Sequence, residues 1–137
     1  MRRQIPENVR LLVANRAGRK CEYCQISDEY TLFAFHIDHI ISIKHGGDTH
    51  ADNLAYSCQI CNLNKGTDIA TILDNSDTLI RLFNPRIDAW SEHFSIDLMG
   101  EILPLSEIGR ATIKLLDLNH PESIIERREQ LRVKRIE

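Results

Sequence analysis

Residues 36–48 read HIDHIISIKHGGD, and this stretch places three histidines, two aspartates and two glycines around the apolar run Ile40-Ile41-Ser42-Ile43. A buried strand does not require so many nitrogen and carboxylate groups, and an exposed loop does not require three isoleucines. The Gly46-Gly47-Asp48 sequence that ends the stretch is typical of a turn. The segment therefore indicates a strand end that carries polar side chains into a turn.

On either side of this stretch, the four cysteines of the chain form two C-x-x-C pairs, Cys21/Cys24 and Cys58/Cys61. Each pair brings two thiolates to one side of a tight turn, and two pairs supply the tetrahedral sulfur set that structural zinc prefers. Disulfides are disfavoured in a chain expected to be cytoplasmic, a redox pair would not need a second copy, and an iron–sulfur centre stays an alternative. We predict a structural Zn²⁺ site closed by four protein ligands.

The spacing between the two pairs is unusual, because residues 25–57 separate Cys24 from Cys58. This spacer is longer than the roughly 15–20 residues that are common in simple zinc ribbons. It contains the stretch described above, so the zinc site would hold both ends of an inserted hairpin and the start of the following helix. The expected role of the zinc is to keep a second site rigid.

Length and composition indicate one globular domain over residues 1–137, with 42% hydrophobic and 27% charged residues. The N-terminus has no apolar run typical of a signal peptide, and no stretch approaches a membrane span, so we expect a cytoplasmic protein without a membrane partner. The net charge of −3 argues mildly against a general nucleic-acid binder. Six basic and two acidic side chains precede Cys24, which softens that objection.

The sequence pattern predicts an α+β fold with an N-terminal helix, a core over residues 21–66 and a C-terminal α/β extension over residues 67–137. The extension is expected to hold a hairpin and two helices. The predicted helices begin near Pro6, Gln59, Ser106 and Pro121, and the second of them ends at Gly66. The predicted strands cover residues 31–41, 53–57, 79–83, 90–96 and 101–103.

The motifs C-E-Y-C, H-I-D-H-I-I, G-G-D, D-N-L and C-Q-I-C-N-L-N-K-G over residues 21–66 resemble the HNH endonuclease family. The resemblance implies a ββα-metal (His-Me) finger, two short strands and a helix that grip one divalent cation. It also implies that His39 activates water and that products carry 5′-phosphate and 3′-hydroxyl ends. The stretch from Leu82 to Thr112 is similar to the block that follows the finger in some stand-alone bacterial HNH proteins.

The chemistry of the residues supports the same interpretation. Hydrolysis of a phosphodiester needs an activated water, and histidine, with an unperturbed pKa of about 6.5, suits a general base. Asp38 and Asn62 offer hard oxygen ligands for a catalytic Mg²⁺ or Mn²⁺ ion. Lys65 lies at i+3 from Asn62 and is predicted to reach a phosphate from the same helix face. His45, in the hairpin loop, is a second candidate for substrate binding.

Strand geometry limits these assignments. Adjacent strand residues point to opposite faces, so Asp38 and His39 can share a site only if the strand ends or bulges near residues 38–40. By the same rule His36 shares a face with Asp38 and is a possible further metal ligand. Asn53 is assigned to the catalytic group because its amide is expected to tie the loop to the strand and orient His39.

The predicted function is a metal-dependent HNH endonuclease that acts on DNA. The alternative is a zinc-stabilised finger that binds nucleic acid or protein without cleaving it, and a toxin-like nuclease with an inhibitor partner is a third possibility. The sequence leaves open the target, DNA against RNA, and nicking against double-strand cleavage. It also leaves open whether the protein forms a homodimer or has a partner protein.

Overall fold

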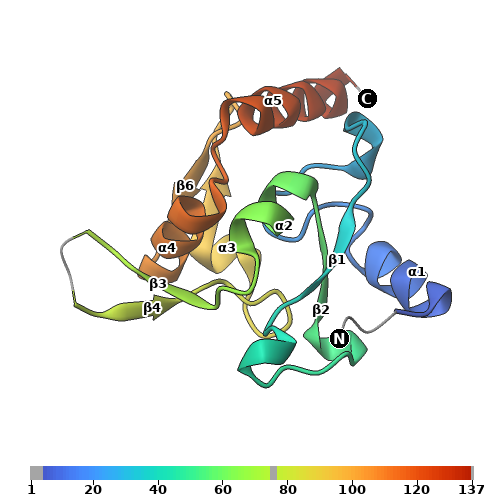
Figure 1. Cartoon of the computed structure of the whole chain (residues 1–137). Coiled ribbons are helices and arrows are strands. Elements are labelled where there is room, and N and C mark those ends of the chain that lie inside the picture. The colour runs from blue at the N-terminus through green and yellow to red at the C-terminus, as the bar shows by residue number, and fades with distance from the viewer. Residues whose placement is uncertain (1–4, 75–76, 137) are drawn as a thin grey trace.

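The computed structural model describes residues 5–74 and 77–136 as an α+β fold (Figure 1). The five α-helices among these residues are α1 (Glu7–Arg16), α2 (Gln59–Lys65), α3 (Trp90–His93), α4 (Glu107–Leu116) and α5 (Pro121–Ile136). The strands form three separate antiparallel pairs: β1 (His36–His39) with β2 (Leu54–Ser57), β3 (Ala70–Ile72) with β4 (Leu79–Arg81), and β5 (Phe94–Ile96) with β6 (Ile102–Pro104). Short 3₁₀ turns cover Asp28–Tyr30, Ile43–His45 and Ala51–Asn53.

The centre of the molecule is a ββα unit made of β1, β2 and α2 (Figure 1). The two strands pair from His36 opposite Ser57 to His39 opposite Leu54. Helix α2 starts immediately after β2, because Cys58 has an extended backbone and its sulfur accepts a hydrogen bond from the Cys61 amide. Helix α1 packs on β2, and the Arg16 guanidinium donates to the Leu54 carbonyl at 2.7 Å.

The loop between β1 and β2 is fixed by one side chain. The Asn53 amide donates to the carbonyls of Ile41 (2.9 Å) and Asp48 (2.8 Å), and its oxygen accepts from the Ile41 amide at 3.0 Å. Gly47 lies so close to this junction that a Cβ atom there would overlap the Ile41 carbonyl and approach the Asn53 amide. The two ends of the loop therefore lie in direct backbone contact, with Gly47 against Ile41.

The C-terminal extension attaches to the ββα unit through α4. Ser106 caps α4, since its hydroxyl accepts from the Gly109 amide at 3.0 Å, and α4 contacts α2. The β3–β4 pair projects from the body at the side of α4 (Figure 1). One continuous core joins the two parts, with Val13, Leu54, Phe94, Ile102 and Leu116 among its fully buried members.

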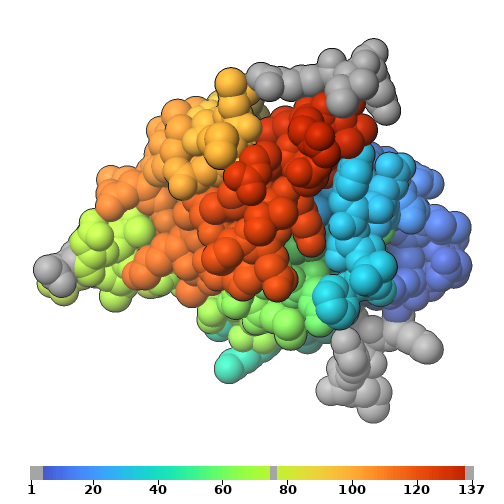
Figure 2. Space-filling model, turned by 90° about the horizontal axis from the view of Figure 1, so that it is seen from above, coloured from blue at the N-terminus to red at the C-terminus, as the bar shows by residue number. Residues whose placement is uncertain are grey.

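Helix α5 packs against the first C-x-x-C turn. Seen from above, α5 crosses between the N-terminal part of the chain and the C-terminal hairpin (Figure 2). The Gln130 side chain accepts from the Ser27 amide at 2.8 Å and donates to the Gln25 carbonyl at 2.9 Å. Arg127 donates to the Cys24 carbonyl at 3.4 Å. None of the helices in the described ranges has the length and apolarity to cross a membrane.

Several predicted elements differ from the observed ones. The strand predicted for residues 31–41 covers only His36–His39, because β2 offers just four pairing positions. The strand predicted for residues 90–96 begins as the short helix α3 and becomes a strand at Phe94. β3 was not predicted, since a three-residue strand carries almost no periodicity. Helix α2 has the predicted bounds.

We expect Gly47→Ala to destabilise the fold by about 2–3 kcal/mol, because the added methyl group overlaps the backbone of Ile41. The measurement is urea unfolding followed by circular dichroism. Gly18→Ala is the control: Gly18 has a left-handed backbone but open space around it, so the loss there is limited to about 1 kcal/mol. Equal losses at the two positions would show that the Gly47 contact does not constrain the loop.

Candidate metal centre and cleft

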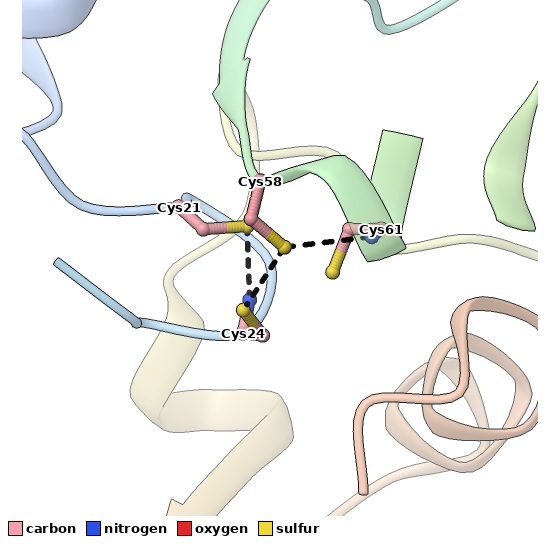
Figure 3. A group of neighbouring side chains, drawn as sticks. All are labelled: Cys21, Cys24, Cys58 and Cys61. Carbon is pink, nitrogen blue, oxygen red and sulfur yellow. Dashed lines mark hydrogen bonds between the residues drawn. The ribbon is translucent and has the colours of Figure 1, made fainter. Parts of the chain in front are cut away.

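The four cysteines converge on one point in the structure (Figure 3). Their sulfur atoms all lie within 4.8 Å of one another, and all four side chains are buried. The Cys24 and Cys58 sulfurs are 3.6 Å apart, close to the roughly 3.8 Å expected between two sulfurs of a tetrahedral zinc site with bonds of about 2.3 Å. Within the described residues this is the one such cluster of cysteine, histidine and acidic ligand atoms.

The chemistry of this sulfur set fits Zn²⁺. The Cys24 amide lies 3.4 Å from the Cys21 sulfur, and the Cys61 amide lies 3.4 Å from the Cys58 sulfur. These N–H···S contacts favour thiolates. Hydrogen bonding to Cys21 raises the pKa of the Cys24 and Cys61 thiols, so four thiolates coexist there only with a cation that compensates their charge. The predicted structural zinc ligands are therefore brought together.

A buried arginine lies beside this cluster. Arg127 of α5 is 1% exposed, and its guanidinium donates to the carbonyls of Gly100 (2.7 Å) and Cys24 (3.4 Å) and to the Asn119 side chain (3.1 Å). Burial lowers the pKa of Arg127, whereas the cysteine thiolates raise it. Since zinc with four thiolates carries a net charge of about −2, Arg127 is a counter-charge for the loaded site.

A cleft of about 1000 Å³ opens between β1, the loop that follows it, the end of α2 and the start of α1. We call it the β1–α2 cleft. The predicted site residues His36, Asp38, His39 and Asn62 all line it. Strand β1 pairs regularly as far as His39 and ends there, so the strand end that the sequence analysis required lies at residue 39.

Asp38 lies at the floor of the β1–α2 cleft and is only 5% exposed. Its Oδ2 atom accepts a hydrogen bond of 2.7 Å from the Tyr23 hydroxyl. The Lys65 ammonium lies 3.3 Å from Oδ1 and 3.2 Å from Oδ2. Burial raises the pKa of the Asp38 carboxyl, and Lys65 and Tyr23 act in the opposite direction. Burial and Asp38 also raise the pKa of Tyr23, which keeps its hydroxyl a donor.

His39 is half-buried, and its Nε2 atom lies 3.3 Å from the Thr49 hydroxyl. The Asn53 side chain holds Ile41 and Asp48 on the two sides of the loop. Asn53 thus ties Ile41 and Asp48 of the loop to the residue that precedes β2, and its influence on His39 stays a prediction. No hydrogen bond to the His36 or Asn62 side chain occurs among residues 5–74 and 77–136, so both are available within the cleft.

The two predicted substrate contacts lie elsewhere than expected. Lys65 is 1% exposed, and its ammonium also donates to the His39 carbonyl at 3.0 Å. His45 is exposed on the loop and does not line the β1–α2 cleft. The cleft instead receives Lys44 from the loop and Glu7 and Arg10 from α1.

Sequence reasoning missed Tyr23 and the residues of α1. The position of Tyr23 between two zinc ligands was visible, but nothing in the sequence indicated that its hydroxyl reaches Asp38. Arg10 lies on α1 and is exposed, and in the sequence it looks like an ordinary solvated side chain. Only the packing of α1 on β2 brings it to the cleft.

Comparison with known families agrees with this geometry. Residues 21–68 match the family model described as HNH endonuclease, a range that contains the cysteine cluster, β1, β2 and α2. Over these residues the chain is similar to HNH endonuclease domains, which supports nuclease activity in general. No significant match to the chain was found among curated proteins or solved structures.

We expect the purified protein to contain about one zinc ion per chain. We expect Cys58→Ser to lose the zinc and most of the folding stability, because only three thiolate ligands remain and zinc binding contributes to folding. Metal analysis and thermal unfolding measure the two effects. Gln59→Ala is the matched control, since it changes the neighbouring residue and keeps all four thiols. A metal-free Cys58→Ser protein with wild-type stability would exclude a structural zinc site.

Proposed function

We propose that this protein is a metal-dependent endonuclease that hydrolyses phosphodiester bonds of DNA, with His39 as the general base. The observation that carries the proposal is the β1–α2 cleft, which His36, Asp38, His39 and Asn62 all line within the range matched by the HNH family model. The alternative function is a zinc-stabilised finger that binds nucleic acid or protein without cleaving it. Binding alone does not require this group of side chains.

The environment of His39 supports the role of a base. With Nε2 directed at the Thr49 hydroxyl, Nδ1 has no hydrogen-bond partner within the described ranges and is open to a water molecule. A proton on Nε2 would be donated to Thr49, which leaves the lone pair of Nδ1 to accept the proton of the attacking water. Asn53 supports this arrangement by holding the loop that carries Thr49 against the strand end.

Asp38 and Asn62 are the residues that would hold a catalytic Mg²⁺ or Mn²⁺ ion, with His36 as a possible third ligand. A carboxylate has about four acceptor positions, and the contacts of Tyr23 and Lys65 occupy three of them. A carboxylate oxygen and an amide oxygen fit Mg²⁺, which retains several waters. The bound ion supplies charge stabilisation at the phosphate and the leaving oxygen.

Two cations of the β1–α2 cleft suit the DNA backbone. Arg10 and Lys44 line the cleft and are exposed, so both can contact phosphate. Lys65, in contrast, would act on the substrate only through Asp38 and the His39 carbonyl unless it left its buried position. We propose that Lys65 organises the site and that Arg10 and Lys44 make the phosphate contacts. We also propose that the protein acts in the cytoplasm.

We expect supercoiled plasmid DNA to be nicked in the presence of Mg²⁺ or Mn²⁺, and His39→Ala to lower the rate at least about 100-fold, because general-base catalysis contributes that much or more. The measurement is the conversion of supercoiled to open-circular DNA on a gel. Addition of EDTA should stop the reaction, and excess Mg²⁺ should restore it.

His50→Ala is the matched control, because His50 lies in the loop that follows β1, is exposed and does not line the β1–α2 cleft. It should cleave at the wild-type rate. If His39→Ala cleaves as fast as the wild type, His39 is not the base. If the wild-type protein binds DNA but leaves it uncut with either ion, the zinc-stabilised binding finger is the better description.

A further inference from the structure

Tyr23 connects the zinc cluster to the proposed catalytic site. It lies between the two ligands of the first C-x-x-C turn, and its side chain is fully buried at 0% exposure. Its hydroxyl donates to Asp38 Oδ2 at 2.7 Å, and its carbonyl accepts from the Trp90 indole at 2.9 Å. The ring packs edge-to-face with Phe83, with the centroids 6.5 Å apart. Tyr23 is thus fixed at its backbone, its ring and its hydroxyl.

The second C-x-x-C turn reaches the same carboxylate. Cys58 and Cys61 lie at the start of α2, and Lys65, the final residue of that helix, places its ammonium against both oxygens of Asp38. The same ammonium donates to the His39 carbonyl. One side chain from the first turn, Tyr23, and one from the helix that begins with the second turn, Lys65, therefore both contact Asp38.

We propose that Tyr23 is a positioning residue through which the zinc site orients the Asp38 carboxylate for the catalytic ion. The inference rests on the proposed function for the role of Asp38 as a ligand of that ion. Its consequence is that the two metal sites are coupled: the divalent ion binds tightly only when the first C-x-x-C turn is held by zinc and the Tyr23 hydroxyl is in place.

Lys65 and Tyr23 have different effects on the Asp38 carboxylate, because the two donors differ in geometry. A lysine ammonium is a point charge on a flexible stem, so Lys65 neutralises Asp38 without fixing its rotation. The Tyr23 hydroxyl stands on a rigid ring and bonds Oδ2 alone, which leaves Oδ1 as the oxygen that points away from the tyrosine. Hydrogen bonds of this kind to a ligating group hold its orientation, and their loss typically weakens metal binding about 10–100-fold.

The test is Mn²⁺ binding to zinc-loaded protein, measured by the electron paramagnetic resonance signal of free Mn²⁺ and independent of DNA cleavage. Tyr23→Phe removes the hydroxyl and keeps the ring. We expect its dissociation constant for Mn²⁺ to rise about 10-fold or more, with one zinc per chain retained. The Mn²⁺ concentration that gives half-maximal cleavage should rise by a similar factor.

Tyr56→Phe is the matched control. The Tyr56 hydroxyl donates to Asp28 at 2.7 Å, the same length as the bond from Tyr23 to Asp38, and neither Tyr56 nor Asp28 lines the β1–α2 cleft. A purely structural role of such a bond would affect both variants in their melting temperature only. We expect Tyr56→Phe to bind Mn²⁺ as the wild type does.

If Tyr23→Phe and Tyr56→Phe bind Mn²⁺ with equal affinity, the inference is wrong while the endonuclease proposal is untouched. If wild-type protein binds Mn²⁺ but cleaves no DNA, the proposed function fails and the coupling stands on the binding data. Absence of any Mn²⁺ binding to the wild type overturns the coupling. Should Tyr23→Phe not fold, a slowly exchanging tyrosine hydroxyl proton in the wild type must shift on addition of Mg²⁺, and an unchanged signal contradicts the proposal.

Discussion

The convergence of four buried cysteine sulfurs holds together parts of the chain that secondary structure alone would leave separate. The first C-x-x-C turn follows α1, the second opens α2, and β1 and β2 lie between them. A hairpin of two four-residue strands is too short to be stable by itself. Its register and its attachment to α2 therefore depend on the sulfur cluster and on the apolar core that surrounds it.

The buried charged groups near β1 fix the positions of neighbouring elements more than they stabilise the fold. A buried ion pair such as that of Lys65 with Asp38 gains little net free energy, because both charges lose their hydration. Removing either partner leaves an uncompensated buried charge, which is costly. The same holds for Arg127 beside the thiolates. These buried contacts tie α2 to the end of β1 and α5 to the first C-x-x-C turn.

The sequence allowed a good prediction wherever the signal was local or depended on fixed spacing. Helix α2 has its predicted bounds because Cys58 caps it and Gly66, with a positive φ, ends it. The α+β class and the sulfur cluster followed from the motifs. Residues 31–34 misled because their β-branched and aromatic composition suits a strand, whereas β2 provides no pairing partner for them. Their Leu32 and Phe33 side chains are exposed.

The candidate site was predictable as a set of residues, but not as a network of contacts. Motif spacing indicated Asp38, His39 and Asn62, and the structure places all three at one cleft. The bond from Tyr23 to Asp38 and the entry of Arg10 into the cleft depend on how α1 and the first turn pack against the strands. Such contacts arise from tertiary structure, and no periodicity or propensity encodes them.

The attachment of α5 to the first C-x-x-C turn has a consequence for the order in which the protein matures. The Cys24 carbonyl and the Ser27 amide find their partners 103 residues further along the chain, in Arg127 and Gln130. While a ribosome is still translating the segment between them, those backbone groups bond to water, and the turn lacks its buried counter-charge. The first C-x-x-C turn therefore gains these partners only once α5 has been translated, and a variant that lacks α5 would leave the Cys24 carbonyl and the Ser27 amide bonded to water.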